Sequence, residues 1–313
     1  MQQARVLVTG AGGFIGRWSV PGLLASGFAV HAVLAPHSAP PVPAALAGAA
    51  LHRADLLDAA AAGDLIRQVR PSHLLHFAWI AIPGIYRQSE DNYRWLAASR
   101  TLLEAFLRAG GARAVIAGSS AEYAAGAGLC VERQSALADD GAAAVTPYAQ
   151  CKLALYRDLL AASRSAGLSA AWGRIFLQFG PAEHPDRLVP AVIRRLLLNQ
   201  EAPCTHGRQV RSFLHCADVG AAFAALLASD LQGAVNIGSD RSITVAGLAA
   251  MIAAQIGRPE LLRLGALPAP AAEPAVLVPD VRRLRGELGW TPRFDLAGGL
   301  ADTIAWWRRE LRC

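Results

Sequence analysis

Short apolar runs alternate with longer amphipathic stretches along the first half of this chain of 313 residues. The apolar runs predict strands, and apolar positions recurring every three or four residues predict helices. The expected strands are 5–9, 28–34, 51–55, 73–78, 112–118, 169–176 and 234–237. A first helix is expected to end near residue 27, and three further helices are expected at 59–69, 91–109 and 148–166. Apolar strands separated by helices are typical of a parallel sheet covered on both faces. The pattern therefore predicts a Rossmann-like α/β fold with a doubly wound parallel sheet.

The pattern changes after Gly180-Pro181, where Pro, Arg and Gly interrupt it and the elements become shorter. The strand at 234–237 is expected to return to the large sheet. We therefore expect a large domain over residues 1–180 that takes back a segment at about 207–239. Residues 181–206 and 240–313 are expected to form a smaller C-terminal α/β lobe.

Composition narrows the class of protein. Hydrophobic residues make up 53% of the chain and charged residues 17%, which excludes disorder. The net charge of +6 is spread along the chain, and no nucleic-acid module accompanies it. This distribution favours small anionic ligands over nucleic acid.

The sequence predicts neither a membrane span nor a metal site. Residues 18–51 contain no Asp, Glu, Lys or Arg, but five prolines in this stretch forbid a continuous helix. The first residues lack the layout of a signal peptide. Five scattered cysteines without a Cys-x-x-Cys pair fit reduced thiols and no zinc site. A cytoplasmic location is therefore expected.

A glycine-rich loop follows the first strand directly and opens the first helix. Gly10, Gly13 and Gly16 have the spacing G-x-x-G-x-x-G. Glycine permits a tight turn and lets backbone N–H groups approach a pyrophosphate at the positive end of a helix. An ordinary glycine turn is the alternative, but the position between strand and helix favours dinucleotide binding. Phe14 and Ile15 of this loop are expected to contact the cofactor as well.

The end of the second strand bears on which dinucleotide binds. A carboxylate there would hold a ribose 2′-OH, but this chain continues Ala35-Pro36-His37-Ser38. A 2′-phosphate would suit His37, Ser38 or Arg17, so we expect NADP(H), with NAD(H) as the alternative. Asp55, after the third strand, is a candidate for the adenine amino group, and a plain surface carboxylate is the other interpretation.

Tyr148 and Lys152 are spaced i and i+4 on an expected helix and so share one face. The ammonium can lower the pKa of the phenol from ~10 and also reach the nicotinamide ribose. Lys152 is the only lysine in the chain, and an arginine would not provide the same compact charge. Ser119 ends the fifth strand, where a hydroxyl can polarise a substrate carbonyl; a serine turn is the alternative there.

In this order and spacing, these residues resemble the extended short-chain dehydrogenase/reductases, which include nucleotide-sugar epimerases, dehydratases and 4-ketoreductases. The resemblance extends over almost the whole chain, through His76-Phe77-Ala78-Trp79, Arg174, Gly180-Pro181, Arg211–His215, Asn236-Ile237-Gly238 and Leu288–Pro292. It implies a catalytic triad of Ser119, Tyr148 and Lys152. It also implies cofactor contacts from Leu56, Phe77 and Ala78, and substrate contacts from Trp79, Ser120, Glu122, Arg187 and Arg211.

Departures from the family pattern narrow the expected chemistry. The 4,6-dehydratases carry an Asp-Glu pair directly after the triad Ser or Thr, whereas this chain has Ser120 and Ala121. The segments 79–86 and 117–123 are more similar to the NDP-4-keto-6-deoxyhexose reductases. The indole of Trp79 would restrict the turnover of the sugar ring that epimerases need; a core position for Trp79 is the alternative.

The resemblance therefore implies NADPH-dependent reduction of the 4-keto group of a nucleotide-activated 4-keto-6-deoxyhexose. An NAD-dependent NDP-sugar 4-epimerase is the first alternative, and a catalytically silent NADP-sensing binding protein is the second. The expected partners are a nucleotide sugar and a second copy of the chain, but neither nucleic acid nor a membrane. The homodimer is expected to form through the helices 91–109 and 148–166.

Overall fold

The computed structural model describes residues 3–38, 41–124, 126, 128–138, 145–269 and 273–312. Its larger sheet has seven parallel strands in the order β11-β7-β5-β4-β1-β2-β3. These strands are β1 (Arg5–Thr9), β2 (Ala29–Leu34), β3 (Ala50–Arg53), β4 (His73–His76), β5 (Arg113–Ser119), β7 (Ser169–Ile175) and β11 (Gly233–Ile237). The predicted Rossmann-like fold is confirmed, and the strand expected at 234–237 does return to this sheet beside β7.

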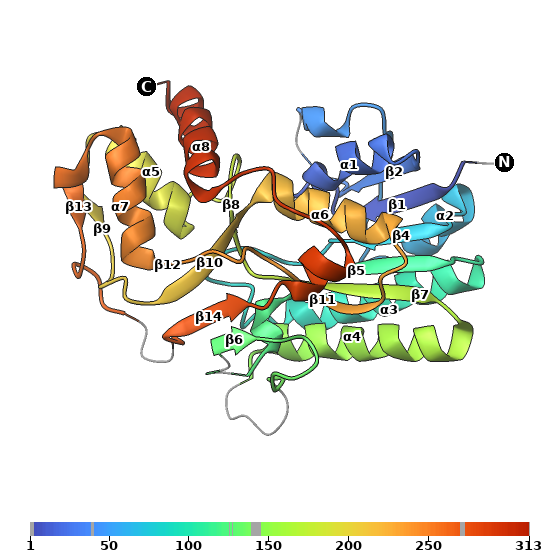
Figure 1. The fold of residues 1–313 in the computed structure, drawn as a ribbon. Coiled ribbons are helices and arrows are strands. Elements are labelled where there is room, and N and C mark those ends of the chain that lie inside the picture. The colour runs from blue at the N-terminus through green and yellow to red at the C-terminus, as the bar shows by residue number, and fades with distance from the viewer. Residues whose placement is uncertain are drawn as a thin grey trace.

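Helices cover both faces of the large sheet (Figure 1). One face packs against α1 (Gly16–Ala25) and α6 (Cys216–Ala228), and the other against α2 (Ala59–Val69), α3 (Asp91–Arg108) and α4 (Pro147–Ala166). Side chains alternate between the faces of a strand. Val6 and Val8 of β1 accordingly belong to the core under α1 and α6, whereas Leu7 belongs to the core under α2, α3 and α4.

Local capping explains where the helices begin and end. The side chain of Asp58 accepts hydrogen bonds from the N–H groups of Ala60 and Ala61, which starts α2 at Ala59. Thr146 caps α4 in the same way, Pro147 occupies the first helical position, and Gly167 ends the helix with a φ of 66°. The expected strands 51–55 and 73–78 end two residues earlier than expected, at Arg53 and His76.

The smaller lobe lies beside the carboxyl ends of the large sheet (Figure 1). Its helices are α5 (Leu188–Leu197), α7 (Val245–Ile256) and α8 (Leu296–Leu311), which share one apolar core. Its main sheet has the order β12-β10-β14-β6, from β12 (Ser242–Thr244), β10 (Val210–His215), β14 (Val276–Pro279) and β6 (Gly128–Cys130), with β8 (Leu177–Phe179) also paired to β10. The short strands β9 (Ala202–Pro203) and β13 (Leu262–Arg263) pair with each other, and the short helical turns are η1 (Ala44–Leu46), η2 (Ser120–Glu122), η3 (Pro259–Leu261) and η4 (Arg283–Glu287).

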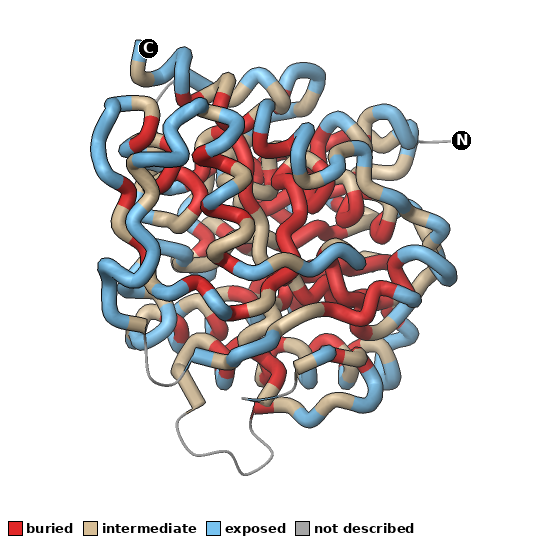
Figure 2. The backbone as a smooth tube through the Cα atoms, turned by 60° about the vertical axis from the view of Figure 1, so that its left-hand side comes forward, coloured by how far each residue is buried: buried red, intermediate tan, exposed pale blue. Residues whose placement is uncertain are grey.

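Two strands cross the expected boundary between the lobes. Both β6 and β8 lie within residues 1–180, yet they pair in the second sheet, and β10 lies within the expected returning segment 207–239. The expected boundary at residue 180 therefore does not separate the two sheets. The pairing partner of a short strand is set by which backbone lies beside it in the tertiary structure. The buried backbone of both lobes forms a continuous interior (Figure 2). No helix in the described part of the chain is long and apolar enough to cross a membrane.

Helices α1 and α6 cross at two glycines although about 200 residues separate them in the chain. A Cβ on Gly220 of α6 would lie 2.5 Å from the Cβ and carbonyl carbon of Trp18, and a Cβ on Gly22 of α1 would lie 2.9 Å from the Cβ of Ala224. Both distances are shorter than real Cβ contacts allow. The backbones of the two helices are therefore in direct contact at this crossing.

We expect Gly220→Ala to destabilise the protein by ~1–3 kcal/mol, because the methyl group forces two packed backbones apart. Chemical denaturation would measure this. Gly286→Ala is the matched control, since a Cβ at Gly286 meets nothing within 4 Å. Equal stability of the two variants would show that the crossing is less tight than described.

Candidate active site

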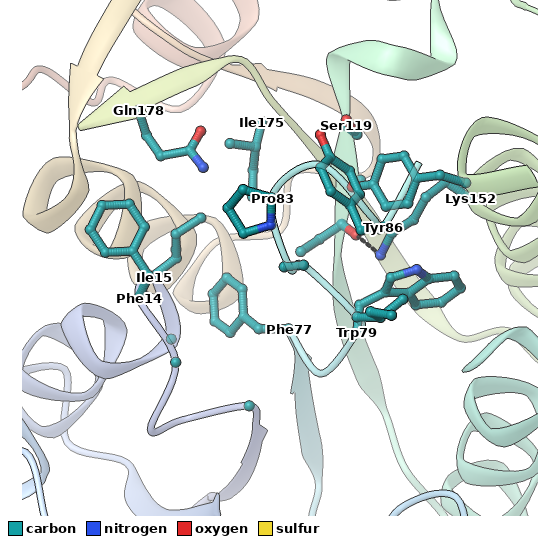
Figure 3. Close-up of a pocket in the computed structure, with 18 of the residues that line it drawn as sticks. Phe14, Ile15, Phe77, Trp79, Pro83, Tyr86, Ser119, Lys152, Ile175 and Gln178 are labelled. Carbon is teal, nitrogen blue, oxygen red and sulfur yellow. Dashed lines mark hydrogen bonds between the residues drawn. The ribbon is translucent and has the colours of Figure 1, made fainter. Parts of the chain in front are cut away.

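A cavity of about 310 Å³ opens where the large sheet meets the smaller lobe (Figure 3). It is bounded by the glycine loop after β1, the loop after β4, the end of β5, the start of α4 and the segment from Ile175 to Arg187. The carboxyl ends of parallel strands are where ligands bind in open α/β sheets. This cavity is therefore the candidate active site.

The glycine loop forms the floor of one end of the cavity. Gly10, Gly13, Phe14, Ile15 and Gly16 all line it, as predicted for cofactor contacts. A Cβ on Gly10, whose φ is 66°, would lie 2.8 Å from the backbone nitrogen of Ala78. Only glycine fits this cradle, and the N-terminus of α1 opens directly behind it. The loop therefore suits the pyrophosphate of a dinucleotide.

The three predicted catalytic side chains line the same cavity. Ser119 lies at the end of β5, and Tyr148 and Lys152 lie one turn apart on α4. The ammonium of Lys152 donates a hydrogen bond to the carbonyl of Ala117 (2.9 Å), and Ser119 is hydrogen-bonded to the Tyr148 hydroxyl. Two distant chain segments thus bring a hydroxyl, a phenol and an ammonium together.

Burial sets the protonation of this group. It lowers the pKa of Lys152 to about 7 and raises the pKa of Tyr148 above its ordinary value, although the hydrogen bond from Ser119 opposes the latter. The ammonium nitrogen lies 5.9 Å from the centre of the Tyr148 ring. In the free protein the pKa of Tyr148 is thus not lowered, contrary to the sequence-based expectation, because desolvation outweighs the distant charge.

Glu122 lies beneath the site rather than in it, and its predicted contact with substrate is wrong. Its carboxylate is completely buried and pairs with Arg174 at 2.8 Å. It also accepts hydrogen bonds from the indole nitrogen of Trp172 and, at 2.7 Å, from the backbone N–H of Ser119. Glu122 therefore holds the catalytic end of β5 in place. Ser120, in contrast, lines the cavity as predicted.

Trp79 forms part of the cavity wall and also packs against the core under α3 and α4. Its indole N–H donates to Asn92 (2.8 Å), and the ammonium of Lys152 lies 3.8 Å from the ring centre (Figure 3). The wall and core interpretations both hold for this residue. Phe77 and Ala78, from the same segment, line the cavity as predicted.

Several predicted cofactor residues lie outside the cavity lining. Arg17 folds back onto the glycine loop, where its guanidinium donates to the carbonyls of Gly13 and Gly12 at 2.8 Å. His37 and Ser38 are solvent-accessible after β2, Asp55 accepts from the backbone N–H of Leu57, and Leu56 is buried. Arg17 was expected to suit a 2′-phosphate, but in this structure its guanidinium braces the glycine loop.

Arg211 does not reach the cavity, so its predicted contact with a substrate diphosphate is not supported by this structure. Its guanidinium is 4% exposed and is bound to the Glu273 carboxylate (2.8 Å) and the Pro274 carbonyl (2.7 Å). A paired and buried guanidinium has few donors left for a ligand. Arg187, the other predicted substrate arginine, does line the cavity.

Tyr86, Arg87 and Glu183 also line the cavity, although no role was predicted for them. The ring of Tyr86 lies 4.8 Å from that of Tyr148 at 88°, and Arg187 lies over it at 5.5 Å. Burial raises the pKa of Tyr86, but Arg87 and Arg187 together lower it below the ordinary value. The third residue, Glu183, is 7% exposed, and burial raises its pKa to about 8. None of the three belongs to the glycine loop or to the Ser119, Tyr148 and Lys152 set, and only the tertiary structure shows that they line the cavity.

Arg53 is a fourth residue without a sequence prediction, and it lies at the expected adenosine end. Its guanidinium donates to the carbonyls of Ala35, Pro36 and Ser38 at 3.4, 3.3 and 3.0 Å. A cation thus stands beside the segment that follows β2. Its place at the end of a parallel strand next to β2 was the signal that could have identified it.

No group of three or more His, Cys, Asp or Glu able to hold a metal occurs in the described residues. His76 is an example of a buried histidine with a structural role. Its ring nitrogens are hydrogen-bonded to Thr9 (2.6 Å) and Ser99 (2.9 Å), and burial lowers its pKa to about 3. It is therefore neutral and cannot act as a proton donor near neutral pH.

Residues 6–238 match the model of the NAD dependent epimerase/dehydratase family. Since this match covers well over half of the chain, the protein belongs to that family. It is thus an enzyme of the extended short-chain dehydrogenase/reductases, as the sequence motifs predicted.

Relatives with different reactions are similar to this chain. A dTDP-4-dehydro-6-deoxy-D-allose reductase from Streptomyces sp is 28% identical, with 98% of this chain and 97% of the relative covered. A dTDP-glucose 4,6-dehydratase from Actinoplanes sp. is also 28% identical over 52% of this chain, which spans about half (51%) of that relative's length. The solved structure of MoeE5 in complex with UDP-glucose and NAD is 33% identical, with 98% and 100% coverage and a TM-score of 0.77.

We expect Arg174→Met to lower the free energy of unfolding by ~3–5 kcal/mol, because it leaves the Glu122 carboxylate buried without its partner. Urea denaturation would measure the loss. Arg100→Met is the control, because its ion pair with Asp158 is half exposed and should contribute less than ~1 kcal/mol. A similar loss in both variants would contradict the role given to the buried pair.

Proposed function

We propose that this enzyme reduces the 4-keto group of a nucleotide-activated 4-keto-6-deoxyhexose with NADPH. The observation that carries the proposal is the meeting of Ser119, Tyr148 and Lys152 beside a glycine cradle in one cavity. Dehydration would need an acid–base pair after Ser119, but Ser120 and Ala121 stand there. Glu122 does not substitute for that pair, because it is buried against Arg174.

When bound, the nicotinamide coenzyme supplies the hydride. The Ser119 hydroxyl donates a hydrogen bond to the substrate carbonyl oxygen and polarises it. Tyr148 gives its phenolic proton to the same oxygen as charge develops there. The Lys152 ammonium, close to the phenol and with a pKa of about 7, stabilises the phenolate that remains. Trp79 packs against the Lys152 ammonium and Tyr86 packs against the Tyr148 ring. These two aromatic side chains keep water away from Lys152 and Tyr148.

The end of β2 supports NADPH rather than NADH. No carboxylate follows Leu34, and the Arg53 guanidinium lies against the 35–38 backbone. A carboxylate would repel a 2′-phosphate, whereas a guanidinium with His37 and Ser38 nearby would bind it.

Arg53→Met should weaken NADPH binding about tenfold or more and leave NADH binding nearly unchanged, since a hydrogen bond to a charged group contributes ~1.5–3 kcal/mol. Fluorescence titration of both cofactors would measure this. Arg67→Met, which removes an exposed arginine of α2, is the control. If the wild-type enzyme binds NADH as tightly as NADPH, the cofactor assignment fails.

An NAD-retaining 4-epimerase is the second candidate function. It is favoured by the similarity, over 98% of this chain, to MoeE5, which was solved with UDP-glucose and NAD. The intact Ser119, Tyr148 and Lys152 set argues against a silent binding protein. A tightly held NAD that survives purification would favour the epimerase.

Tyr148→Phe should lower the turnover of NDP-4-keto-6-deoxy sugars roughly 10²–10⁴-fold, because it removes the proton donor and little packing. NADPH affinity should change little. Tyr93→Phe, an exposed tyrosine of α3, is the control and should turn over normally. Near wild-type turnover by Tyr148→Phe would overturn the triad assignment.

We also propose a homodimer through α3 and α4 in a reducing, cytoplasmic compartment. Most leucines of both helices pack inside the chain, so few of them remain on the outward face for a second copy. Tyr93, Ala97 and Ala161 are exposed there among charged residues. Light scattering at micromolar concentration tests the dimer. The four described cysteines are buried free thiols, which suits a reducing compartment.

A further inference from the structure

The turn after β8 places one carboxyl group inside the cavity with one of its two oxygens unpaired. Glu183 lines the cavity together with the glycine loop and is 7% exposed. Its Oε2 atom is buried and has no hydrogen-bond partner among the described residues. An unpaired buried polar atom is costly, so most such atoms in folded proteins are paired. The position of this oxygen therefore requires an explanation.

The backbone that carries Glu183 is strained. Ala182, directly before it, has a φ of 63°, a conformation that residues other than glycine rarely adopt. The Glu183 N–H closes the turn onto the Gly180 carbonyl at 3.3 Å. A strained turn that buries a carboxyl group with one unpaired oxygen has two energetic costs at one place. Such costs are typical of functional sites.

Packing places this turn beside the N-terminus of α1. Gly180 lies against the first residue of α6, because a Cβ on it would overlap the Cys216 sulfur. One turn further along, α6 crosses α1 at Gly220 and Trp18. The Glu183 carboxyl therefore lies at the end of the cavity where the glycine loop would hold a dinucleotide.

The charged groups around Glu183 do not offset the effect of burial on its pKa. Arg187 at the start of α5 is the nearest cation, but its guanidinium lies over the Tyr86 ring. Cys216 faces Glu183 from α6, with Arg17 of α1 and Asp302 of α8 beyond it. Burial dominates, so the carboxyl is neutral at physiological pH and can donate a hydrogen bond.

We infer that Glu183 is a cofactor-positioning residue that donates a hydrogen bond, as a neutral carboxylic acid, to an oxygen of the bound dinucleotide. This inference rests on the proposed use of a nicotinamide cofactor. A neutral donor suits a diphosphate or carboxamide oxygen, whereas a carboxylate would repel either acceptor. Cofactor binding should therefore weaken when Glu183 loses its proton.

Fluorescence titration of NADPH binding between about pH 6.5 and about pH 9.5 tests this inference. If only the neutral form binds, the apparent Kd of the wild-type enzyme rises about tenfold per pH unit above the pKa of this group. Glu183→Gln keeps a donor that does not ionise, so its Kd at the lower pH should be within about threefold of wild type. Its rise toward the higher pH should be smaller by about thirtyfold, which is the effect of about 1.5 pH units above a pKa of about 8, and any rise that remains belongs to Lys152 or Tyr86.

Glu183→Met removes the donor and should weaken binding about 3- to 10-fold at the lower pH. Asp186→Asn, which alters an exposed carboxylate three residues away, should change neither affinity nor pH profile. Binding of ADP-ribose 2′-phosphate identifies the acceptor, because the loss in Glu183→Met persists if it is the diphosphate and disappears if it is the carboxamide.

The same pH profile for wild type and Glu183→Gln would overturn this inference while leaving the proposed function intact. Failure of the wild-type enzyme to bind either NADPH or NADH would instead overturn the proposed function. A loss of affinity that is equal in Glu183→Gln and Glu183→Met would also contradict the inference, since it would indicate a packing role rather than a donated hydrogen bond.

Discussion

The direct contact between the backbones of α1 and α6 is the constraint on which the rest of the site depends. Helix α1 follows the glycine loop, and α6 follows β10 of the smaller lobe. Because Gly220 has no side chain, the two helices approach until their backbones touch. That contact ties the smaller lobe to the glycine loop. The cavity lies between that loop and the segment from Ile175 to Arg187.

A second constraint acts from beneath the catalytic strand. The Glu122 carboxylate binds Arg174 of β7, the Trp172 indole and the Ser119 backbone, all in the protein interior. A buried ion pair contributes little net stability, because desolvation offsets most of the attraction. Its role here is to fix a position, since it holds the end of β5, where Ser119 lies, in place relative to α4. The Ser119 hydroxyl then meets the Tyr148 phenol without help from a ligand.

Burial also governs the electrostatics of the cavity. Lys152 and Glu183 are both shifted toward their neutral forms, and Tyr148 is shifted the same way. Tyr86, between two arginines, is shifted toward ionisation instead, and the pKa of Arg87 beside it is raised. A cavity whose buried groups are shifted mostly toward their neutral forms suits a ligand that brings its own charge, as an anionic dinucleotide does. Arg53 and Arg187 remain as cations near the opposite ends of that ligand path.

The seven strands of the large sheet, the glycine loop and the Tyr148–Lys152 pair could be predicted from the sequence alone, because each depends on the pattern within one segment. The strands of the second sheet and the helices α5 to α8 were not predicted. A period of 3.6 residues places Tyr148 beside Lys152 whatever surrounds the helix. In contrast, only the tertiary structure decided that Glu122 and Arg211 lie outside the cavity and that Glu183 lines it. A carboxylate three residues from a catalytic serine can face a ligand or an arginine, and only the arrival of β7 with Arg174 decides which. Likewise, Glu183 enters the cavity because α6 supports its turn from a position distant in the chain, and no local pattern records that contact.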